Sequence, residues 1–160
     1  MKMKKFLTLG LAAIMAVSMV GCVNQHPEEA NGTAASSDDV RIVATSPATA
    51  DICDRLELDL VGVCSSTLST IPERYKDVTQ IGTAMSPDLE ILKSLKPDYV
   101  LSPSSLQSDL QPKYESIGVN SIFLNLKSVE GMYASISDLG QKFDREEQAQ
   151  ALVDRSEERR

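Results

Sequence analysis

Residues 81–101 constrain the fold more than any other stretch, because they combine a strand, a short loop, a helix and a second strand. The first strand ends near Ile81, and the Gly-containing loop after it carries Met85 at its tip. Ser86 and Pro87 are expected to begin the helix, because Ser accepts hydrogen bonds from free N–H groups and Pro at the first helical position lacks a donor anyway. This unit places a thioether at the carboxyl end of a strand, where ligands bind in open α/β folds.

The helix of this unit is amphipathic, and a proline sets its end. Its apolar stripe consists of Leu89, Ile91, Leu92 and Leu95. Glu90 falls on the polar side, toward water. Lys96 precedes Pro97, which disfavours helical geometry at Lys96, and residues 99–101 then read as a buried strand.

The same alternation of strand and helix continues in both directions. Further strands are expected at residues 40–45, 60–63, 78–81 and 119–124, and further helices at residues 48–56, from the polar loop 102–105 to about 117, and from Ser128, with one helical turn at 71–75. Pro112 is expected to kink or split its helix, and Gly118 to cap it. This order predicts an α/β fold with a parallel sheet and right-handed connections.

The last predicted helix begins at a capping box. Asp144 stands at the cap position, and Glu147 follows three residues later. The apolar positions 149, 152 and 153 carry the helix to Arg160, and the sequence contains no stop signal for it.

The N-terminal residues have the pattern of an exported lipoprotein. Residues 1–21 combine three lysines with an apolar run that is short for a membrane span, which is typical of a secretion signal peptide. The sequence Met-Val-Gly-Cys then ends at Cys22, which we expect to carry the lipid. Residues 22–39 are polar and are expected to form a flexible tether. His26 lies within it and is interpreted as a solvated residue.

The net charge excludes one class of partner. The full chain has a formal net charge of −7, and removal of residues 1–21 leaves 13 basic and 23 acidic groups. Phosphate binding needs clustered Lys and Arg, so nucleic acid is not an expected partner.

Catalysis has little support in the sequence. We find no nucleophile elbow, phosphate-binding loop or zinc-protease motif. His26 is the one histidine and lies in the tether, so His-dependent nucleophilic catalysis within this chain is excluded. Cys53 and Cys64 fit either a disulfide or two unpaired buried thiols, and we favour the thiols. A redox or hydrolytic enzyme built on these thiols is the alternative of another class.

Two kinds of side chain are candidates for ligand binding. Met85 lies at a loop tip, although methionine is also a common filler of cores. Hydroxyl groups follow two strands on the same sheet edge and precede the central helix; these residues are Thr45, Ser46, Ser65, Ser66 and Ser86. Each is an ordinary turn residue taken singly, and together they are candidates for a ligand wall.

An ordered set of short motifs resembles a known family. The set comprises R-I-V (41–43), P-x-R-Y-K-D-V (72–78), I-G-x-x-M-x-P (81–87), L-K-P (95–97), L-Q-P-x-Y (110–114) and S-x-x-G-M (128–132). It is similar to the N-terminal lobe of the substrate-binding proteins that serve ABC importers of iron complexes, haem and vitamin B12. Within that family, the pattern is most similar to the haem-binding lipoproteins.

The resemblance implies one lobe of a two-lobed, periplasmic-binding-protein-like fold. Residues 40–143 would form the N-terminal substrate-binding lobe, and residues 144–160 would begin the helix that crosses to a second lobe. The sequence of that second lobe is not among the 160 residues, so we expect the chain to represent one lobe of a longer protein.

The resemblance also implies a transported ligand, a permease partner and a location at the membrane. Met85 would be an axial ligand of the iron of haem b (iron protoporphyrin IX), with a histidine from the second lobe as the other ligand. Glu90 would pair with arginine of the ABC permease, and haem donor proteins are further candidate partners. The protein would be held on the extracytoplasmic face of the cell membrane through Cys22. A ferric siderophore or a cobalamin is the alternative cargo within the family.

Overall fold

The computed structural model of the chain describes residues 40–159. The predicted signal peptide (1–21), the predicted lipidation site Cys22, the predicted tether (22–39) and His26 lie outside the described residues. Within residues 40–159, no helix has both the length and the apolar character that crossing a membrane requires.

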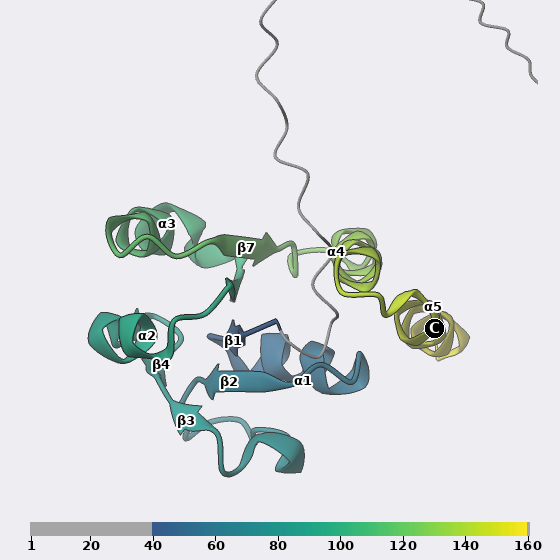
Figure 1. Ribbon diagram of the computed structural model, residues 1–160. Coiled ribbons are helices and arrows are strands. Elements are labelled where there is room, and N and C mark those ends of the chain that lie inside the picture. Colours follow the sequence, from purple (N-terminus) through teal and green to yellow (C-terminus); the bar gives the residue numbers. More distant parts are fainter. Residues whose placement is uncertain (1–39, 160) are drawn as a thin grey trace, which may run out of the picture. The chain divides into compact units, whose positions relative to one another are not determined.

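A five-stranded sheet forms the centre of the described region (Figure 1). In spatial order, its strands are β3 (Thr79–Gln80), β2 (Leu60–Val63), β1 (Ile42–Ala44), β6 (Tyr99–Pro103) and β7 (Ser121–Leu124). Every neighbouring pair is parallel, with Ile42 opposite Leu60 on one side and opposite Tyr99 on the other. The predicted parallel sheet is therefore confirmed.

Helices cover both faces of this sheet. The helices are α1 (Pro47–Arg55), α2 (Leu89–Leu95), α3 (Gln107–Ser116), α4 (Val129–Lys142) and α5 (Glu146–Glu158). In Figure 1, α2 and α3 lie on one side of the sheet, and α1, α4 and α5 lie on the other. Two short 3₁₀ turns, η1 (Glu73–Tyr75) and η2 (Ser104–Leu106), complete the connections. The predicted α/β class is confirmed.

Alternate residues of each strand supply two separate cores. Ile42 and Ala44 of β1 pack in the core beneath α1, α4 and α5, while Val43 packs in the core beneath α2 and α3. All three are at most 1% exposed. Strand side chains point to opposite faces in turn, so a strand that is buried on both faces must be apolar throughout. This explains why β1 reads Ile-Val-Ala.

The helix start at Ser128 follows the sequence prediction, and α1 begins in the same way at Ser46. The Ser46 hydroxyl accepts a hydrogen bond from the Thr49 N–H at 3.1 Å, and Pro47 occupies the first helical position of α1. The Ser128 hydroxyl accepts one from the Gly131 N–H at 3.0 Å. Each hydroxyl satisfies an N–H group that has no partner within its helix.

The predicted start of α2 is wrong by two residues. Ser86 and Pro87 form a short strand, β5, and Asp88 caps the helix instead. The Asp88 carboxylate accepts from the N–H groups of Glu90 and Ile91, at 2.9 and 3.0 Å. A negative carboxylate that serves two N–H groups at the positive end of a helix is a stronger cap than a neutral hydroxyl.

The predicted capping box at Asp144 is also wrong. Asp144 has a φ of +54°, and Arg145 precedes α5 without a side-chain cap. The Arg145 N–H donates to the Gly140 carbonyl at 2.7 Å, which closes a tight turn between α4 and α5. A capping Asp needs an extended backbone, whereas this turn needs a left-handed residue at position 144.

Pro112 lies inside α3, and Gly118 lies just after its end. The helix α3 is continuous from Gln107 to Ser116, so it is not split. Gly118 follows it with a φ of +72°, and its N–H donates to the Glu115 carbonyl at 3.0 Å. The predicted glycine at the helix end is confirmed.

Three buried hydroxyls link β1, β6 and α3. Thr45 and Ser102 share a hydrogen bond of 2.8 Å, and Ser102 shares one of 3.1 Å with the Tyr114 hydroxyl. Thr45 also donates to the Leu101 carbonyl at 3.2 Å. All three side chains are fully buried. Burial raises the pKa of Tyr114, so its hydroxyl stays protonated.

Replacing Tyr114 by Phe should lower the free energy of unfolding by about 1–2 kcal/mol, because it removes one partner from a buried hydrogen bond. Tyr133 supplies the matched control, since its buried hydroxyl has no hydrogen-bond partner among the described residues. Tyr133→Phe should be neutral or slightly stabilising. Urea unfolding of the two variants measures the difference, and equal losses would contradict the prediction.

Candidate functional site

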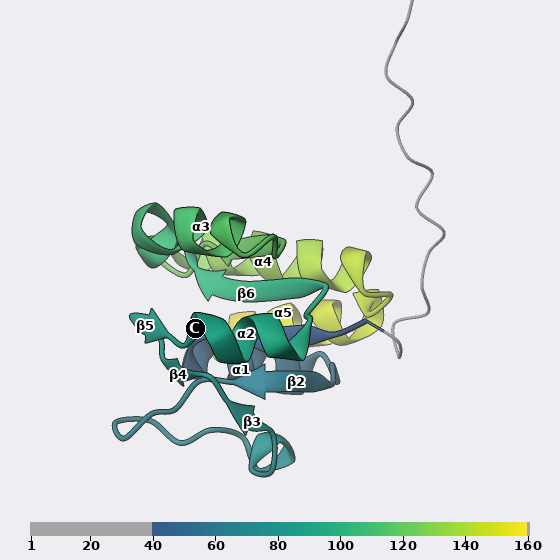
Figure 2. The same ribbon diagram turned by 60° about the vertical axis from the view of Figure 1, so that its left-hand side comes forward.

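A hairpin carries Met85 at the carboxyl edge of the sheet. Its strands β4 (Gly82–Thr83) and β5 (Ser86–Pro87) are antiparallel, and Ala84 and Met85 form the turn between them. In Figure 2, the arrowheads of β2 and β6 point to the side on which β4 and β5 lie. The hairpin therefore lies where the loops that follow the parallel strands also emerge.

Main-chain hydrogen bonds fix the hairpin to the sheet. The Ser65 N–H, just after β2, donates to the Gly82 carbonyl at 2.7 Å, and the Ile81 N–H donates to the Val63 carbonyl of β2 at 2.9 Å. The Asp88 N–H donates to the Ile81 carbonyl at 2.7 Å and closes the base of the hairpin. Gly82 has a φ of +92°, and a Cβ atom there would lie 2.9 Å from the Ser86 carbonyl oxygen. Glycine is therefore required at this position.

A cavity of about 570 Å³ opens between this hairpin and the loop that follows β2. Half of its lining residues have hydroxyl or amide side chains, namely Ser65, Ser66, Thr67, Gln80 and Thr83. The other half are apolar, namely Pro47, Leu68, Ile71, Ala84 and Met85. None of these described lining residues is charged. The wall thus offers neutral hydrogen-bonding groups beside apolar surface.

Two apolar side chains of this wall face solvent. Met85 is 75% exposed and Leu68 is 96% exposed. They are the large apolar side chains of residues 40–159 that stand exposed. The Met85 sulfur is therefore not used to fill the core, which was the alternative interpretation of this residue.

The structure brings together some of the predicted ligand residues. Ser65, Ser66 and Met85 line the same cavity. Thr45 and Ser46 are buried beneath this edge, where their hydroxyls bond within the fold as described above. Ser86 is exposed in β5 and outside the cavity lining.

Glu90 and Leu68 differ in their position relative to the cavity. Glu90 is exposed in the first turn of α2, away from the cavity lining. Leu68 was not singled out from the sequence. Its signal is a lone large apolar residue within the hydroxyl-rich run 65–70.

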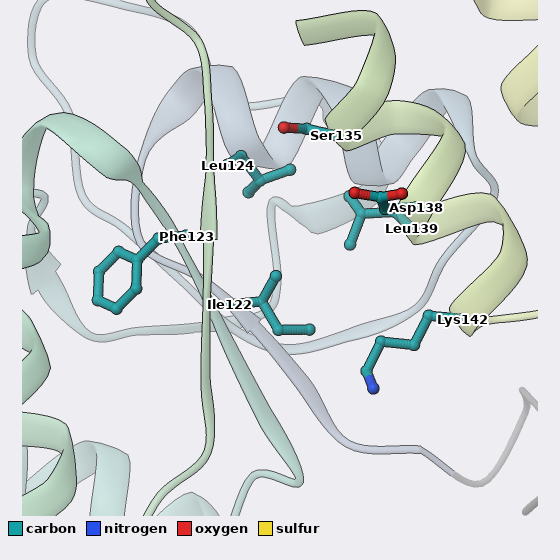
Figure 3. A pocket seen from close by; sticks show the side chains of 7 residues that line it. All are labelled: Ile122, Phe123, Leu124, Ser135, Asp138, Leu139 and Lys142. Carbon is teal, nitrogen blue, oxygen red and sulfur yellow. The ribbon is translucent and has the colours of Figure 1, made fainter. Parts of the chain in front are cut away.

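A second, smaller hollow lies between β7 and α4 (Figure 3). Its volume is about 70 Å³, which is far below the size of a typical ligand pocket. Ile122 and Leu124 contribute from β7, and Ser135, Asp138 and Lys142 contribute from α4. Phe123 points away from the helix in Figure 3, consistent with its stacking on Tyr114. This hollow is too small to be the main binding site.

The two described cysteines are unpaired and buried, as the sequence predicted. Burial raises the pKa of Cys53 to about 12 and that of Cys64 to about 11. A reactive cysteine needs a lowered pKa and access to solvent. Within residues 40–159, no group of three or more His, Cys, Asp or Glu side chains is arranged to hold a metal ion.

A parallel α/β lobe with a cavity at the carboxyl edge of its sheet defines a ligand-binding class of protein. Residues 42–159 match the family described as periplasmic binding protein, and the chain belongs to this family. The family predicted from the sequence motifs is confirmed.

Individual relatives agree with this assignment. The chain is 37% identical over 154 residues to IsdE of Staphylococcus aureus (strain Newman), named a high-affinity heme uptake system protein. This match covers 96% of the chain and 50% of the relative, so the chain spans about half the length of the curated relatives it matches.

Solved structures of related proteins support the same family assignment. An ABC transporter substrate-binding protein from Listeria monocytogenes EGD-e is 43% identical with a TM-score of 0.73, covering 74% of this chain and 46% of that one. S. aureus IsdE complexed with heme is 41% identical with a TM-score of 0.70, covering 73% and 45%. The described region therefore has the fold of one lobe of a two-lobed binding protein.

Gly82→Ala should displace the hairpin and lower the stability of the fold by more than about 1–2 kcal/mol, because it adds a main-chain clash to an unfavourable φ. Gly118→Ala is the matched control: Gly118 also has a positive φ, but a Cβ atom there would meet nothing within 4 Å. Thermal unfolding compares the two variants. Identical behaviour would show that the hairpin does not depend on Gly82.

In a Cys22→Ala background, Cys53 and Cys64 should react slowly with Ellman's reagent at about pH 8, because their raised pKa values leave little thiolate at that pH. Both should react fully in concentrated urea. Reactivity of the folded chain should rise only as the pH approaches about 11. Rapid reaction of either thiol near neutral pH would restore the thiol-enzyme alternative.

Proposed function

We propose that the chain is the N-terminal lobe of the substrate-binding component of an ABC importer and that its cargo is haem b. The similarity to IsdE, a heme uptake protein that has been solved with heme, supports this cargo. Haem is bound as a transported substrate, and the chain is proposed to bind and deliver it without catalysing a reaction.

The observation that carries the proposal is the exposed thioether of Met85 on the rim of an uncharged cavity. Met85 would coordinate the haem iron from one side of the macrocycle. A thioether is a soft, neutral ligand that raises the reduction potential of haem. In this family, the ligand on the other side is expected to come from the second lobe.

The polar half of the wall suits the propionate groups of haem. Ser65 and Ser66 are the cavity residues with hydroxyls that we propose for this role, because a carboxylate accepts hydrogen bonds from hydroxyl and N–H groups. The Ser66 hydroxyl already accepts from the N–H groups of Leu68 and Ser69, which leaves its O–H as a donor for a ligand. The roles of Thr45, Ser46 and Ser86 stay predictions.

The uncharged wall also favours haem over a ferric siderophore. A strongly charged ferric siderophore is best held by charge-assisted hydrogen bonds from Arg or Lys, and the described lining residues include neither. A flat macrocycle needs mainly apolar surface and one iron ligand, and the cavity offers both. Siderophore and cobalamin binding remain as outcomes of the test below.

Delivery requires a permease, and we propose that Glu90 contributes to docking on it. Glu90 is exposed at the start of α2, on the element that follows the hairpin. Charged pairs of this kind orient a complex more than they strengthen it. Attachment to the extracytoplasmic face of the membrane through Cys22 is part of the same proposal.

Haem added to the chain should give a Soret band whose position depends on Met85. Met85→Leu keeps an apolar side chain of similar size but removes the sulfur, so we expect the band to shift and the affinity to fall roughly tenfold. Met132→Leu is the matched control, because Met132 packs against the core under α4 and is outside the cavity. Absorbance titration measures both effects.

A spectrum that is the same for the unmodified chain and for Met85→Leu would refute iron coordination by Met85. Binding of a ferric siderophore or a cobalamin in preference to haem would favour the alternative cargo. The titration therefore separates the ligand role of Met85 from the choice of cargo.

A further inference from the structure

Leu68 is held in solvent by the loop that carries it. It is 96% exposed, which leaves nearly all of its apolar surface in contact with water. Burying such a side chain is favourable, and a free loop would tend to fold it against the protein. Its exposure therefore needs a structural cause.

The turn around Leu68 supplies that cause. The Ser66 hydroxyl accepts hydrogen bonds from the N–H groups of Leu68 and Ser69, at 3.3 and 3.0 Å. These bonds close a tight turn of the kind that serine favours. The side chain of Leu68 then points outward from the turn.

Both ends of the loop are fastened. At its start, the Ser65 N–H bonds to the carbonyl of Gly82 in the hairpin, at 2.7 Å. At its end, the buried Tyr75 hydroxyl donates to the Leu58 carbonyl at 2.6 Å, and Arg74 pairs with Asp59 at 2.6 Å. The loop that displays Leu68 is therefore tied to the hairpin that displays Met85.

Leu68 and Met85 share one cavity, and the remaining apolar lining lies with them. A ligand that reached the Met85 sulfur would meet apolar surface at Leu68 and Ile71 and neutral groups elsewhere. Contact with a wide apolar ring would remove the surface of Leu68 from water, whereas a small or strongly polar ligand would leave it exposed.

We propose that Leu68 is a specificity-determining residue that packs on the apolar surface of the porphyrin, independently of the bond between Met85 and iron. This inference rests on the proposed function and assigns a residue to the choice of cargo. In this proposal, Met85 coordinates the iron, and Leu68 packs against the apolar ring that surrounds it.

Porphyrins with and without iron separate the two roles. Leu68→Ser should lower the affinity for haem and for metal-free protoporphyrin IX by similar factors, roughly tenfold each. Met85→Leu should lower the affinity for haem and leave that for the metal-free ring nearly unchanged. Leu68→Ile should restore most of the affinity, since it returns the apolar contact. Absorbance titration for haem and fluorescence titration for protoporphyrin IX give the values.

The outcomes distinguish this inference from the proposed function. If the unmodified chain binds haem with a band that depends on Met85, and Leu68→Ser changes neither affinity, the inference fails and the proposed function stands. If the unmodified chain binds neither porphyrin, both fail. Thermal unfolding of Leu68→Ser should match the unmodified chain, because the side chain is exposed, so a lost affinity cannot be ascribed to unfolding.

Discussion

The parallel pairing of β1 with β2 on one side and β6 on the other is the constraint on which the rest of the structure depends. Val43 and Ala44 are fully buried, so β1 is enclosed by helices on both faces and by strands on both edges. Parallel strands all end at the same edge of the sheet, and each next connection starts there. The cavity, the hairpin and the loop carrying Leu68 occupy one place for this reason.

Much of the fold could be predicted because local signals and burial agree. Helix starts such as Ser46 and Ser128 follow from a hydroxyl before an amphipathic run, and the strands follow from short apolar stretches. The two wrongly predicted helix starts have a common cause. Ser86 pairs with Thr83 in a hairpin, and Asp144 lies in a left-handed turn that the Arg145 N–H closes on the Gly140 carbonyl. In each case, the geometry that ends the preceding element fixes the backbone at the position where a cap was predicted.

The candidate site was predicted in part. Met85 and the hydroxyls of Ser65 and Ser66 could be placed at one edge because the order of strands and helices fixes that edge. The exposure of Leu68 could not be predicted, since an isolated leucine is usually part of a core and only its neighbours show otherwise. Thr45 lies on the correct edge, but a hydroxyl at a strand end can point into the fold as readily as out of it.

The hairpin is attached to the sheet by main-chain atoms, through the N–H groups of Ser65 and Ile81. These groups exist whatever side chains surround them, so residues 83–86 can diverge during evolution while the hairpin keeps its position. Gly82, just before this range, cannot diverge in the same way, since its backbone geometry excludes a side chain. Under the proposed function, the side chain at position 85 can therefore be exchanged, and the choice of metal complex altered with it, by single substitutions that leave the framework intact.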